Sequence, residues 1–447
     1  MTSTTPPTVY IETYGCQMNV SDSELILGSL AAGGYAQAPD PQSADVILVN
    51  TCAIRDHAEQ RVIGRLGELK RDMKPGSVVG VTGCMAQRLG PRLLDSARHV
   101  SFVIGPDGYR ALPALVEGAR RGERSTATSF DLEEHYEDFK PRRFDRVKAW
   151  IPVQRGCDYR CTYCIVPTTR GPERSRRLAD VVRETADVVA EGMSEVVLLG
   201  QTVNSYHDGT HDFADLLRAV GTVPGVRRLR FTSPHPNDFS DRVIAAMADV
   251  PSVCEHVHLP MQSGSSRVLK RMLRRYTREE YFDCVARLRA AIPGITLTTD
   301  IIVGFPGETD ADFEDTLSAV REVGFADAFT FKFSPREGTP ATRLPPADTV
   351  SDAVAAERLA RLVDTVRAGA RRQNLALLGR RVEVMVEKEA RRGGDLVQAR
   401  TRDFKTVLIP GDETLLGRYF TVALTGTTGS TFTGAVVPER APLPMAG

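Results

Sequence analysis

The sequence predicts an α/β protein with an N-terminal doubly wound parallel sheet, a central partial (β/α)6 barrel and a small C-terminal all-β barrel. Three observations support this fold class. Strand and helix patterns alternate near the N-terminus, the alternation starts anew near residue 145 and continues for six units, and the final stretch alternates apolar with polar residues between glycines. The expected limits are a disordered tail over 1–8, a first domain over 9–124, a charged linker over 125–144, the central barrel over 145–375 and the last domain over 376–440.

Composition restricts the function. The 447 residues contain 57 Lys plus Arg and 57 Asp plus Glu, so any basic surface for nucleic acid must be local. The sequence contains no apolar run long enough to cross a membrane and no signal peptide, and we expect a cytoplasmic protein without membrane contact. Eight cysteines in such a chain indicate metal or redox roles rather than disulfides.

The first domain places three cysteines at the ends of expected strands. TVYIETYGC ends at Cys16, ADVILVNTC at Cys52 and SVVGVTGC at Cys84, and a helical stretch follows each. Because functional groups gather beyond the carboxyl ends of parallel strands, we expect these thiols at one edge of the sheet. One such cysteine alone is most often a buried small hydrophobic residue, but three at equivalent positions indicate a shared role. The sequence therefore predicts a [4Fe-4S] cluster on these thiolates, with one iron left open.

The central barrel begins with three more cysteines. Cys157, Cys161 and Cys164 lie in RGCDYRCTYCIVP. Three thiolates on one short loop can bind three irons of a cubane and leave the fourth iron open to a small molecule, so we predict another [4Fe-4S] cluster here. A structural zinc site needs four ligands, and this loop has no nearby His or fourth Cys, but a reduced or zinc-bound loop remains the alternative. Cys254 and Cys284 fit neither set and are expected to be packed and inert.

Polar residues gather at the expected carboxyl ends of the barrel strands, where the site of such a barrel lies. His235 is one of them. Gly304, in VGFPGE, would let the backbone approach a ligand closely, because it follows a barrel strand. The candidate cofactor-binding residues are Tyr163, Gln201, Asn204, Ser233, Gln262, Asp300 and Gly304.

Two basic runs predict contact with RNA. The C-terminal strands are of the kind that build small oligonucleotide-binding barrels, and basic residues outnumber acidic ones between Arg371 and Lys405. A second run extends from Arg267 to Arg278 in the middle domain. A charge run is usually a solvated face, but two such runs beside this kind of barrel favour RNA. The candidate RNA-binding residues are Lys270, Arg271, Arg274, Arg275, Arg380, Arg381, Arg400, Arg402 and Lys405.

The chain resembles the radical SAM methylthiotransferase family over nearly its whole length. The loop around Cys157, with aromatic Tyr163 before its last cysteine, is similar to the loop at which radical SAM enzymes bind S-adenosylmethionine (SAM). TYGCQMNVSDSE, NTCAIRDHAEQRV, LLGQTVNSY and HLPMQSGSSRVLKRMLRRYTREEY resemble the members that modify dimethylallyladenosine in tRNA. The family has three parts in the same order, the last being a TRAM domain. Thr202 departs from the family pattern, in which Asn is usual, and we expect it not to touch a metal ligand.

This resemblance implies a reaction and its partners. N(6)-dimethylallyladenosine in the tRNA anticodon loop would become its 2-methylthio derivative, at a carbon without an acidic proton, so a radical cofactor must supply the difficult step. One SAM would methylate sulfur held at the first-domain cluster, and a second SAM would be cleaved at the loop cluster to a 5′-deoxyadenosyl radical. The resemblance further implies a sulfur donor and an electron donor such as flavodoxin or ferredoxin, and we expect a monomer.

Other functions stay open at this point. The substrate could instead be a ribosomal-protein aspartate or threonylcarbamoyladenosine in tRNA, as in sister enzymes of similar architecture. An electron-transfer protein could carry two clusters, but it would need neither an open iron nor an RNA-binding domain. A non-enzymatic iron–sulfur or zinc protein that binds RNA is the remaining alternative.

Overall fold

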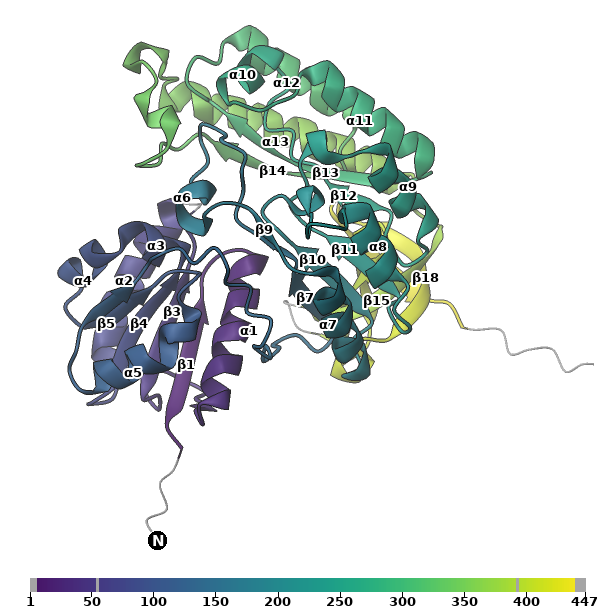
Figure 1. Cartoon of the computed structure of the whole chain (residues 1–447). Helices are drawn as coiled ribbons and strands as arrows, with labels where there is room; N and C mark the ends of the chain where they lie inside the picture. Colours follow the sequence, from purple (N-terminus) through teal and green to yellow (C-terminus); the bar gives the residue numbers. More distant parts are fainter. Residues whose placement is uncertain (1–5, 54–55, 391–393, 439–447) are drawn as a thin grey trace, which may run out of the picture.

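The structure is a computed structural model, and it describes residues 6–53, 56–390 and 394–438. Figure 1 shows an N-terminal α/β domain in purple and blue, a central domain in teal and green, and a yellow C-terminal barrel. The three-part α/β architecture predicted from the sequence is confirmed.

The N-terminal domain is a parallel sheet covered by helices on both faces. Over the described residues its six strands have the order β2-β1-β3-β4-β5-β6, and every pairing is parallel. The strands are β1 (Thr8–Thr13), β2 (Ala36–Gln37), β3 (Val46–Thr51), β4 (Val78–Gly83), β5 (Val100–Ile104) and β6 (Ser125–Ala127). The helices are α1 (Gln17–Ala32), α2 (Asp56–Asp72), α3 (Cys84–Leu89), α4 (Pro91–Ser96) and α5 (Leu112–Arg120), with the 3-10 turn η1 (Tyr109–Ala111).

Alternate strand residues supply the two hydrophobic cores of this domain. Leu48 points with α1 and α5 into one core, whereas its neighbour Val49 packs with α2, α3 and α4 in the other. Burial on both faces explains why β3 and β4 read as continuous apolar runs. Strand β6 lies at the start of the segment expected as a linker and pairs with β5, so this sheet extends beyond residue 124.

The central domain is an open barrel of parallel strands. Over the described residues, β7, β10 and β11 form one three-stranded sheet and β12, β13 and β14 another, and a parallel bridge between Leu229 and Val253 joins them. The strands are β7 (Lys148–Pro152), β10 (Glu195–Leu199), β11 (Arg228–Phe231), β12 (His256–His258), β13 (Thr296–Val303) and β14 (Asp327–Lys332). Helices α7 (Leu178–Ala190), α8 (Phe213–Gly221), α9 (Asp241–Asp249), α11 (Arg278–Ala291), α12 (Asp310–Val323) and α13 (Asp352–Leu375) surround them.

The shorter elements of the central domain lie mainly near the ends of its strands. They are β8 (Gln154–Arg155), β9 (Arg174–Ser175), α6 (Val166–Arg170), α10 (Ser266–Arg271), η2 (Val203–Ser205), η3 (Pro236–Asp238), η4 (Pro340–Arg343) and η5 (Pro346–Asp348). Leu198 and Leu229 belong to the core beneath the helices, so the residues that alternate with them line the inner face of the barrel.

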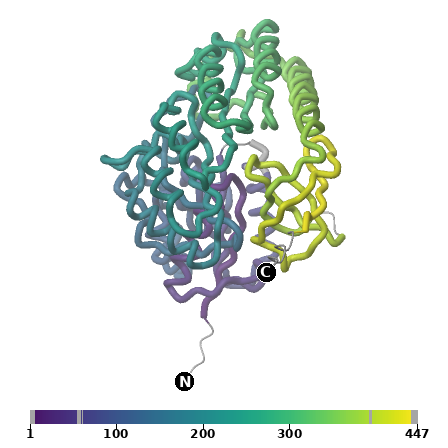
Figure 2. Tube along the Cα trace, turned by 90° about the vertical axis from the view of Figure 1, so that its right-hand side faces the viewer, coloured from purple at the N-terminus to yellow at the C-terminus, as the bar shows by residue number. Residues whose placement is uncertain are grey.

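The C-terminal domain is a closed barrel with the strand order β15-β16-β17-β19-β18. Its elements are β15 (Arg381–Glu389), β16 (Leu396–Thr401), β17 (Thr406–Pro410), η6 (Glu413–Leu415), β18 (Tyr419–Thr427) and β19 (Thr431–Val436). Figure 2 shows this yellow barrel beside the central domain. Arg228 is fully buried there and donates to the backbone oxygen of Arg400 and to Glu383 at 2.7 and 3.0 Å. The barrel is therefore docked on β11.

Across the described residues, no helix combines the length and apolar character needed to cross a lipid bilayer.

Candidate functional site

The CxxxCxxC loop lies between β8 and α6. Thr162 N donates to the backbone oxygen of Met272 at 2.9 Å, which ties the loop to α10. Burial, with the neighbouring thiols of Cys161 and Cys157, raises the pKa of Cys164 to about 12. The three thiols therefore lie close together in a place where a thiolate needs a positively charged partner such as iron.

Two polar side chains contact this loop directly. The hydroxyl of Thr202 lies 3.1 Å from Cys157 Sγ, and Arg274 Nη1 donates to Cys161 Sγ at 3.5 Å. The expectation that Thr202 stays away from a candidate ligand is therefore wrong, because η2 turns its hydroxyl toward the loop. Gln201 also supports the loop, since its Oε1 accepts from Gly156 N at 2.6 Å.

Cys16, Cys52 and Cys84 come together beyond the carboxyl ends of β1, β3 and β4. A hydrogen bond with Cys52 lowers the pKa of Cys16 to about 6. Burial raises the pKa of Cys84, and the charge of Cys16 contributes in the same direction. Gly15, with φ +151°, could not carry a side chain, because a Cβ there would lie 2.8 Å from Cβ of Cys52. The sheet topology thus gathers thiols that are far apart in the chain.

Arg170 joins the two cysteine sets. It ends α6, which follows the loop of Cys164, and its Nε donates to Cys84 Sγ at 3.1 Å. Its Nη2 donates to Asp22 Oδ2 at 2.6 Å, and Arg155 lies 3.3 Å from the other oxygen of that carboxylate. All these side chains are buried. An arginine from the central domain is thus inserted beside the cysteines of the first domain.

The residues around Cys84 fit an anionic cluster. Among the described residues, Nη1 of Arg170 and Nη1 of Arg155 have no hydrogen-bond partner, although both atoms are buried. Buried donors are normally satisfied, and sulfide or thiolate acceptors of an iron–sulfur cluster would satisfy such groups.

The chain is similar to known proteins over nearly its whole length. The model described as "Uncharacterized protein family UPF0004" matches residues 8–105, and that of the "Radical SAM superfamily" matches residues 151–320. A tRNA-2-methylthio-N(6)-dimethylallyladenosine synthase of Acidothermus cellulolyticus is 46% identical over 429 residues, covering 94% of this chain and 86% of the relative. This chain belongs to that family. A synthase of the same name from Geobacillus kaustophilus is 43% identical over 441 residues, covering 96% of this chain and 82% of the relative.

Solved radical SAM structures share the fold. The methyltransferase TsrM of Kitasatospora setae, solved with cobalamin and a [4Fe-4S] cluster, superposes with a TM-score of 0.57 at 15% identity, over 76% of this chain and 74% of that one. The radical SAM enzyme OxsB superposes with a TM-score of 0.53 at 12% identity, over 81% and 57% of the two chains. This chain belongs to the radical SAM superfamily and therefore uses SAM and a [4Fe-4S] cluster.

The candidate cofactor-binding residues do not all face one point. Asn204 is buried and exchanges two hydrogen bonds with the backbone of His235. Ser233 and Gln262 have left-handed backbones, with φ of 59° and 69°, at the ends of barrel strands. Tyr163 packs in an apolar cluster that includes Phe305. These contacts and backbone conformations lie within the protein itself, and contact of these residues with a cofactor stays a prediction.

Two further candidates are engaged with neighbours. Asp300 Oδ2 lies 3.2 Å from His258 Nε2 on the inner face of the barrel. Gly304 has φ +71° and donates to Glu308 at 2.7 Å, and a Cβ there would meet Ala355. Cofactor contact by these residues stays a prediction.

Sequence reasoning missed Arg170 and Gln154. Gln154 Oε1 accepts from the backbone nitrogens of Gln201 and Thr202, so it connects the strand before the cysteine loop with the loop after β10. The basic run RGPERSRR that follows the cysteine loop is the one signal that could have drawn attention to Arg170. Its partners lie in another domain, so the run alone could not name them.

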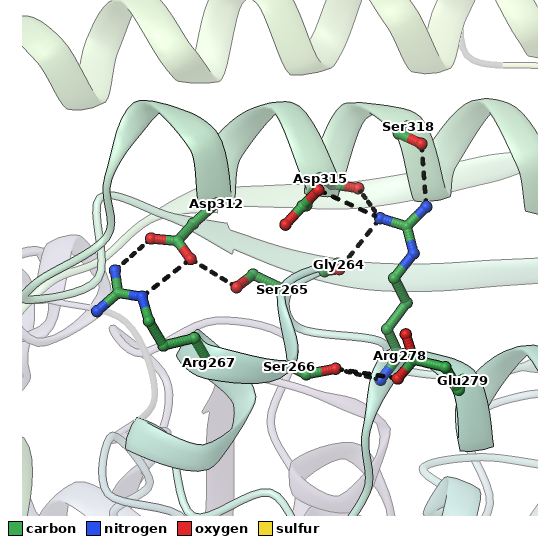
Figure 3. A pocket seen from close by; sticks show the side chains of 9 residues that line it. All are labelled: Gly264, Ser265, Ser266, Arg267, Arg278, Glu279, Asp312, Asp315 and Ser318. Carbon is green, nitrogen blue, oxygen red and sulfur yellow. Dashed lines mark hydrogen bonds and ion pairs between the residues drawn. The ribbon is translucent and has the colours of Figure 1, made fainter.

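Many residues of the basic runs are paired inside the protein. A surface hollow of about 440 Å³ is lined by Arg267 and Arg278. Both side chains point toward α12 (Figure 3). Arg267 pairs with Asp312, and Arg278 Nη1 donates to the backbone oxygen of Asp315 at 2.7 Å. This hollow is bounded by the elements that these arginines hold together.

The candidate RNA-binding residues divide in the same way. Arg271 pairs with Asp348, Arg400 with Glu387 and Arg402 with Glu255, while Arg274 contacts Cys161 and Lys405 is buried. These charges serve the fold, and Arg400 and Arg402 lie where the C-terminal barrel meets the central domain. Candidates with exposed side chains are Lys270, Arg275, Arg380 and Arg381.

Proposed function

We propose that this protein is a radical SAM methylthiotransferase that converts N(6)-dimethylallyladenosine in the tRNA anticodon loop to its 2-methylthio derivative. The names of the relatives support the substrate. The observation that carries the proposal is the direct contact between the two cysteine sets through α6. Arg170 binds Cys84, and Ile165, directly after Cys164, packs against Cys84 and Ala53. A site for SAM and a second cysteine site thus face each other within one molecule.

The two cysteine sets define the cofactors of the proposal. Cys157, Cys161 and Cys164 would hold the cluster that binds SAM, and the first-domain cysteines would hold a second [4Fe-4S] cluster. Bound there, these groups would supply the reductive cleavage of SAM and a place for the sulfur to be transferred. The orphaned Nη1 of Arg170, whose Nε binds Cys84, supports the second cluster.

The protein side chains orient the reactants and exclude water. Met18 and Cys16 pack against Val197 and Leu199 on the inner face of β10. This contact places apolar groups of the central domain beside Cys16. The target carbon has no acidic proton, so the reaction proceeds through a radical. Such a radical needs protection, because it would otherwise react with other groups.

Further partners belong to the same proposal. The reaction needs a sulfur donor and an electron donor, for which flavodoxin or ferredoxin is suited, and the chain would act as a monomer. No disulfide joins any of its eight cysteines, all of which lie in the described residues, and this fits a reducing compartment, so we place the enzyme in the cytoplasm together with its tRNA substrate.

Nucleoside mass spectrometry of tRNA from cells with and without this protein tests the proposal. We expect the 2-methylthio derivative to disappear and the unmodified N(6)-dimethylallyladenosine to accumulate when the protein is absent. The wild-type gene should restore the product, and Cys157→Ala should not. If methylthio-threonylcarbamoyladenosine or a methylthio-aspartate of a ribosomal protein disappears instead, the sister activity is the correct one.

A further inference from the structure

Much of the inner face of the central barrel is covered by the other two domains. On β7 and β10, Trp150, Val197 and Leu199 pack against Met18 and Cys16 of the first domain. On β11, the inward-facing Arg228 and Arg230 are buried beneath the C-terminal barrel. Arg230 donates to backbone oxygens of that barrel at 2.8 and 2.9 Å. The inward faces of β7, β10 and β11 are therefore covered by the other two domains.

The inner face of β12 and β13 carries a connected polar row instead. His256 and His258 both lie 3.0 Å from the hydroxyl of Thr298, and His258 lies 3.2 Å from Asp300. Val257 and Leu297 alternate with them and belong to the core under the helices, so the row faces inward. The side chains of His258 and Asp300 stay 21% and 30% exposed. This wall is accessible.

Two exposed phenylalanines flank the polar row. Phe329 of β14 pairs in register with Asp300, lies edge-on to His258 at 5.9 Å and is 58% exposed. Phe404, from the turn between β16 and β17, stacks on His256 at 4.6 Å and is 42% exposed. The aromatic surfaces come from different domains, but both border the same wall.

The wall leads to the cysteine loop. Its strand continues from His258 to Pro260, whose oxygen accepts from Arg274 at 3.3 Å, and the same guanidinium donates to Cys161. Pro260 follows His256 by four residue steps of extended chain, a span of roughly 13 Å. A molecule lying along the row would therefore reach from the C-terminal barrel toward the SAM-binding loop.

Cationic side chains lie around His256 at the end of the wall next to the C-terminal barrel, where Arg230 is paired with Glu195 and Arg400 with Glu387. Burial, together with the charges of Arg230 and Arg400, holds the pKa of His256 well below its usual range, and Lys405 acts in the same direction. The guanidinium of Arg400 lies 4.5 Å from the ring centroid of Phe404. Aromatic rings beside cations suit single-stranded RNA, whose bases stack and whose phosphates are attracted.

We propose that Phe329 and Phe404 form a stacking platform for unpaired bases of the tRNA anticodon loop and so direct the target base along the β12–β13 wall. This inference rests on the proposed function, because tRNA is the substrate of that reaction. Phe329 is the principal contact, since it is the more exposed ring. Stacked bases would cover the aromatic surface that the fold leaves in water.

Binding of an anticodon stem-loop RNA with 2-aminopurine in its loop tests this inference, using full-length protein with reconstituted clusters. We expect Phe329→Ala to weaken binding roughly 5- to 150-fold and to abolish fluorescence quenching on binding. Phe404→Ala should act in the same direction, and Phe329→Tyr should restore both signals because it keeps the ring. Phe144→Ala is the matched control, because Phe144 is 43% exposed but lies before β7, where its backbone nitrogen donates to Glu24 of the first domain. Iron content and circular dichroism of each variant establish that it has folded.

Unchanged affinity and quenching in Phe329→Ala, while wild-type protein binds this RNA and forms the methylthio product, would overturn the platform and leave the proposed function standing. A wild-type protein that binds a ribosomal-protein segment in place of RNA would overturn both. An equal loss in Phe144→Ala and Phe329→Ala would also refute the platform, because the effect would then be non-specific.

Discussion

Arg170 Nε lies 3.1 Å from Cys84 Sγ and links the loop of one cysteine set to a cysteine of the other. The same guanidinium binds Asp22, and all three side chains are buried. Burial of a charge is unfavourable unless it is paired, so this arrangement holds the two domains in one relative position. The geometry between the two proposed clusters therefore depends on a residue that ligates neither.

Arg170→Ala should weaken this junction. Removing one partner of a buried ion pair typically costs about 3–5 kcal/mol, here moderated because Arg155 also lies near Asp22. We expect a lower denaturation midpoint for the apoprotein and loss of iron from the first-domain site. Arg183→Ala is the control, because Arg183 pairs with Asp180 on the surface of α7. Equal midpoints for wild type and Arg170→Ala would contradict this role.

The cysteine sets should hold iron independently. Replacing Cys157, Cys161 and Cys164 together by Ala should leave about half of the iron and abolish SAM cleavage. Replacing the first-domain set should also leave about half of the iron but permit SAM cleavage to 5′-deoxyadenosine. Cys284→Ala should keep the full iron content, because Cys284 is buried in α11 and burial raises its pKa to about 12. Full iron retention in either triple variant, or zinc in its place, would refute the assignment.

Thr202→Val should change the loop cluster without removing a ligand. Hydrogen bonds to cluster thiolates raise the reduction potential, so loss of the Thr202 hydroxyl beside Cys157 should lower it. A potentiometric titration followed by EPR, in a protein lacking the first-domain cysteines, measures the loop cluster alone. Thr202→Ser should keep the wild-type potential. Identical potentials in the Val and Ser variants would show that the hydroxyl does not act on the cluster.

Glu387 should make the docking of the C-terminal barrel sensitive to acid. Burial would raise the pKa of Glu387, but the charges of Lys148 and Arg400 outweigh it and lower the pKa from 4.5 to about 2. Because the folded pKa is the lower one, this carboxylate stabilises the fold above about pH 4.5, and that contribution is lost as the pH falls toward 2. The difference corresponds to roughly 3 kcal/mol.

Urea denaturation of wild type and Glu387→Gln between pH 6 and pH 3 measures this contribution. The free energy of unfolding should fall more steeply with decreasing pH in the wild type than in the variant. Glu389→Gln, at the exposed end of the same strand, should follow the wild-type curve. Parallel curves for wild type and Glu387→Gln would refute the prediction.

The three-part architecture and the places of the cysteines in it follow from local sequence patterns. Strand and helix periodicities are local, and the carboxyl ends of parallel strands share an edge, so Cys16, Cys52 and Cys84 had to come near one another once the sheet was predicted. The CxxxCxxC spacing likewise needs no information from outside its own loop. These features depend on residues close in the chain or on the rules of one sheet.

Which charged side chains and aromatic rings remain available to a ligand depends on how distant segments pack together. Arg402 and Arg274 belong to basic runs in the sequence, yet one binds Glu255 and the other contacts Cys161. Phe329 resembles any strand phenylalanine, and its exposure follows from how the domains leave one wall of the barrel uncovered. Such outcomes depend on which side chains from distant segments meet when domains pack. Local pattern carries no information on that, because each partner lies far away in the sequence.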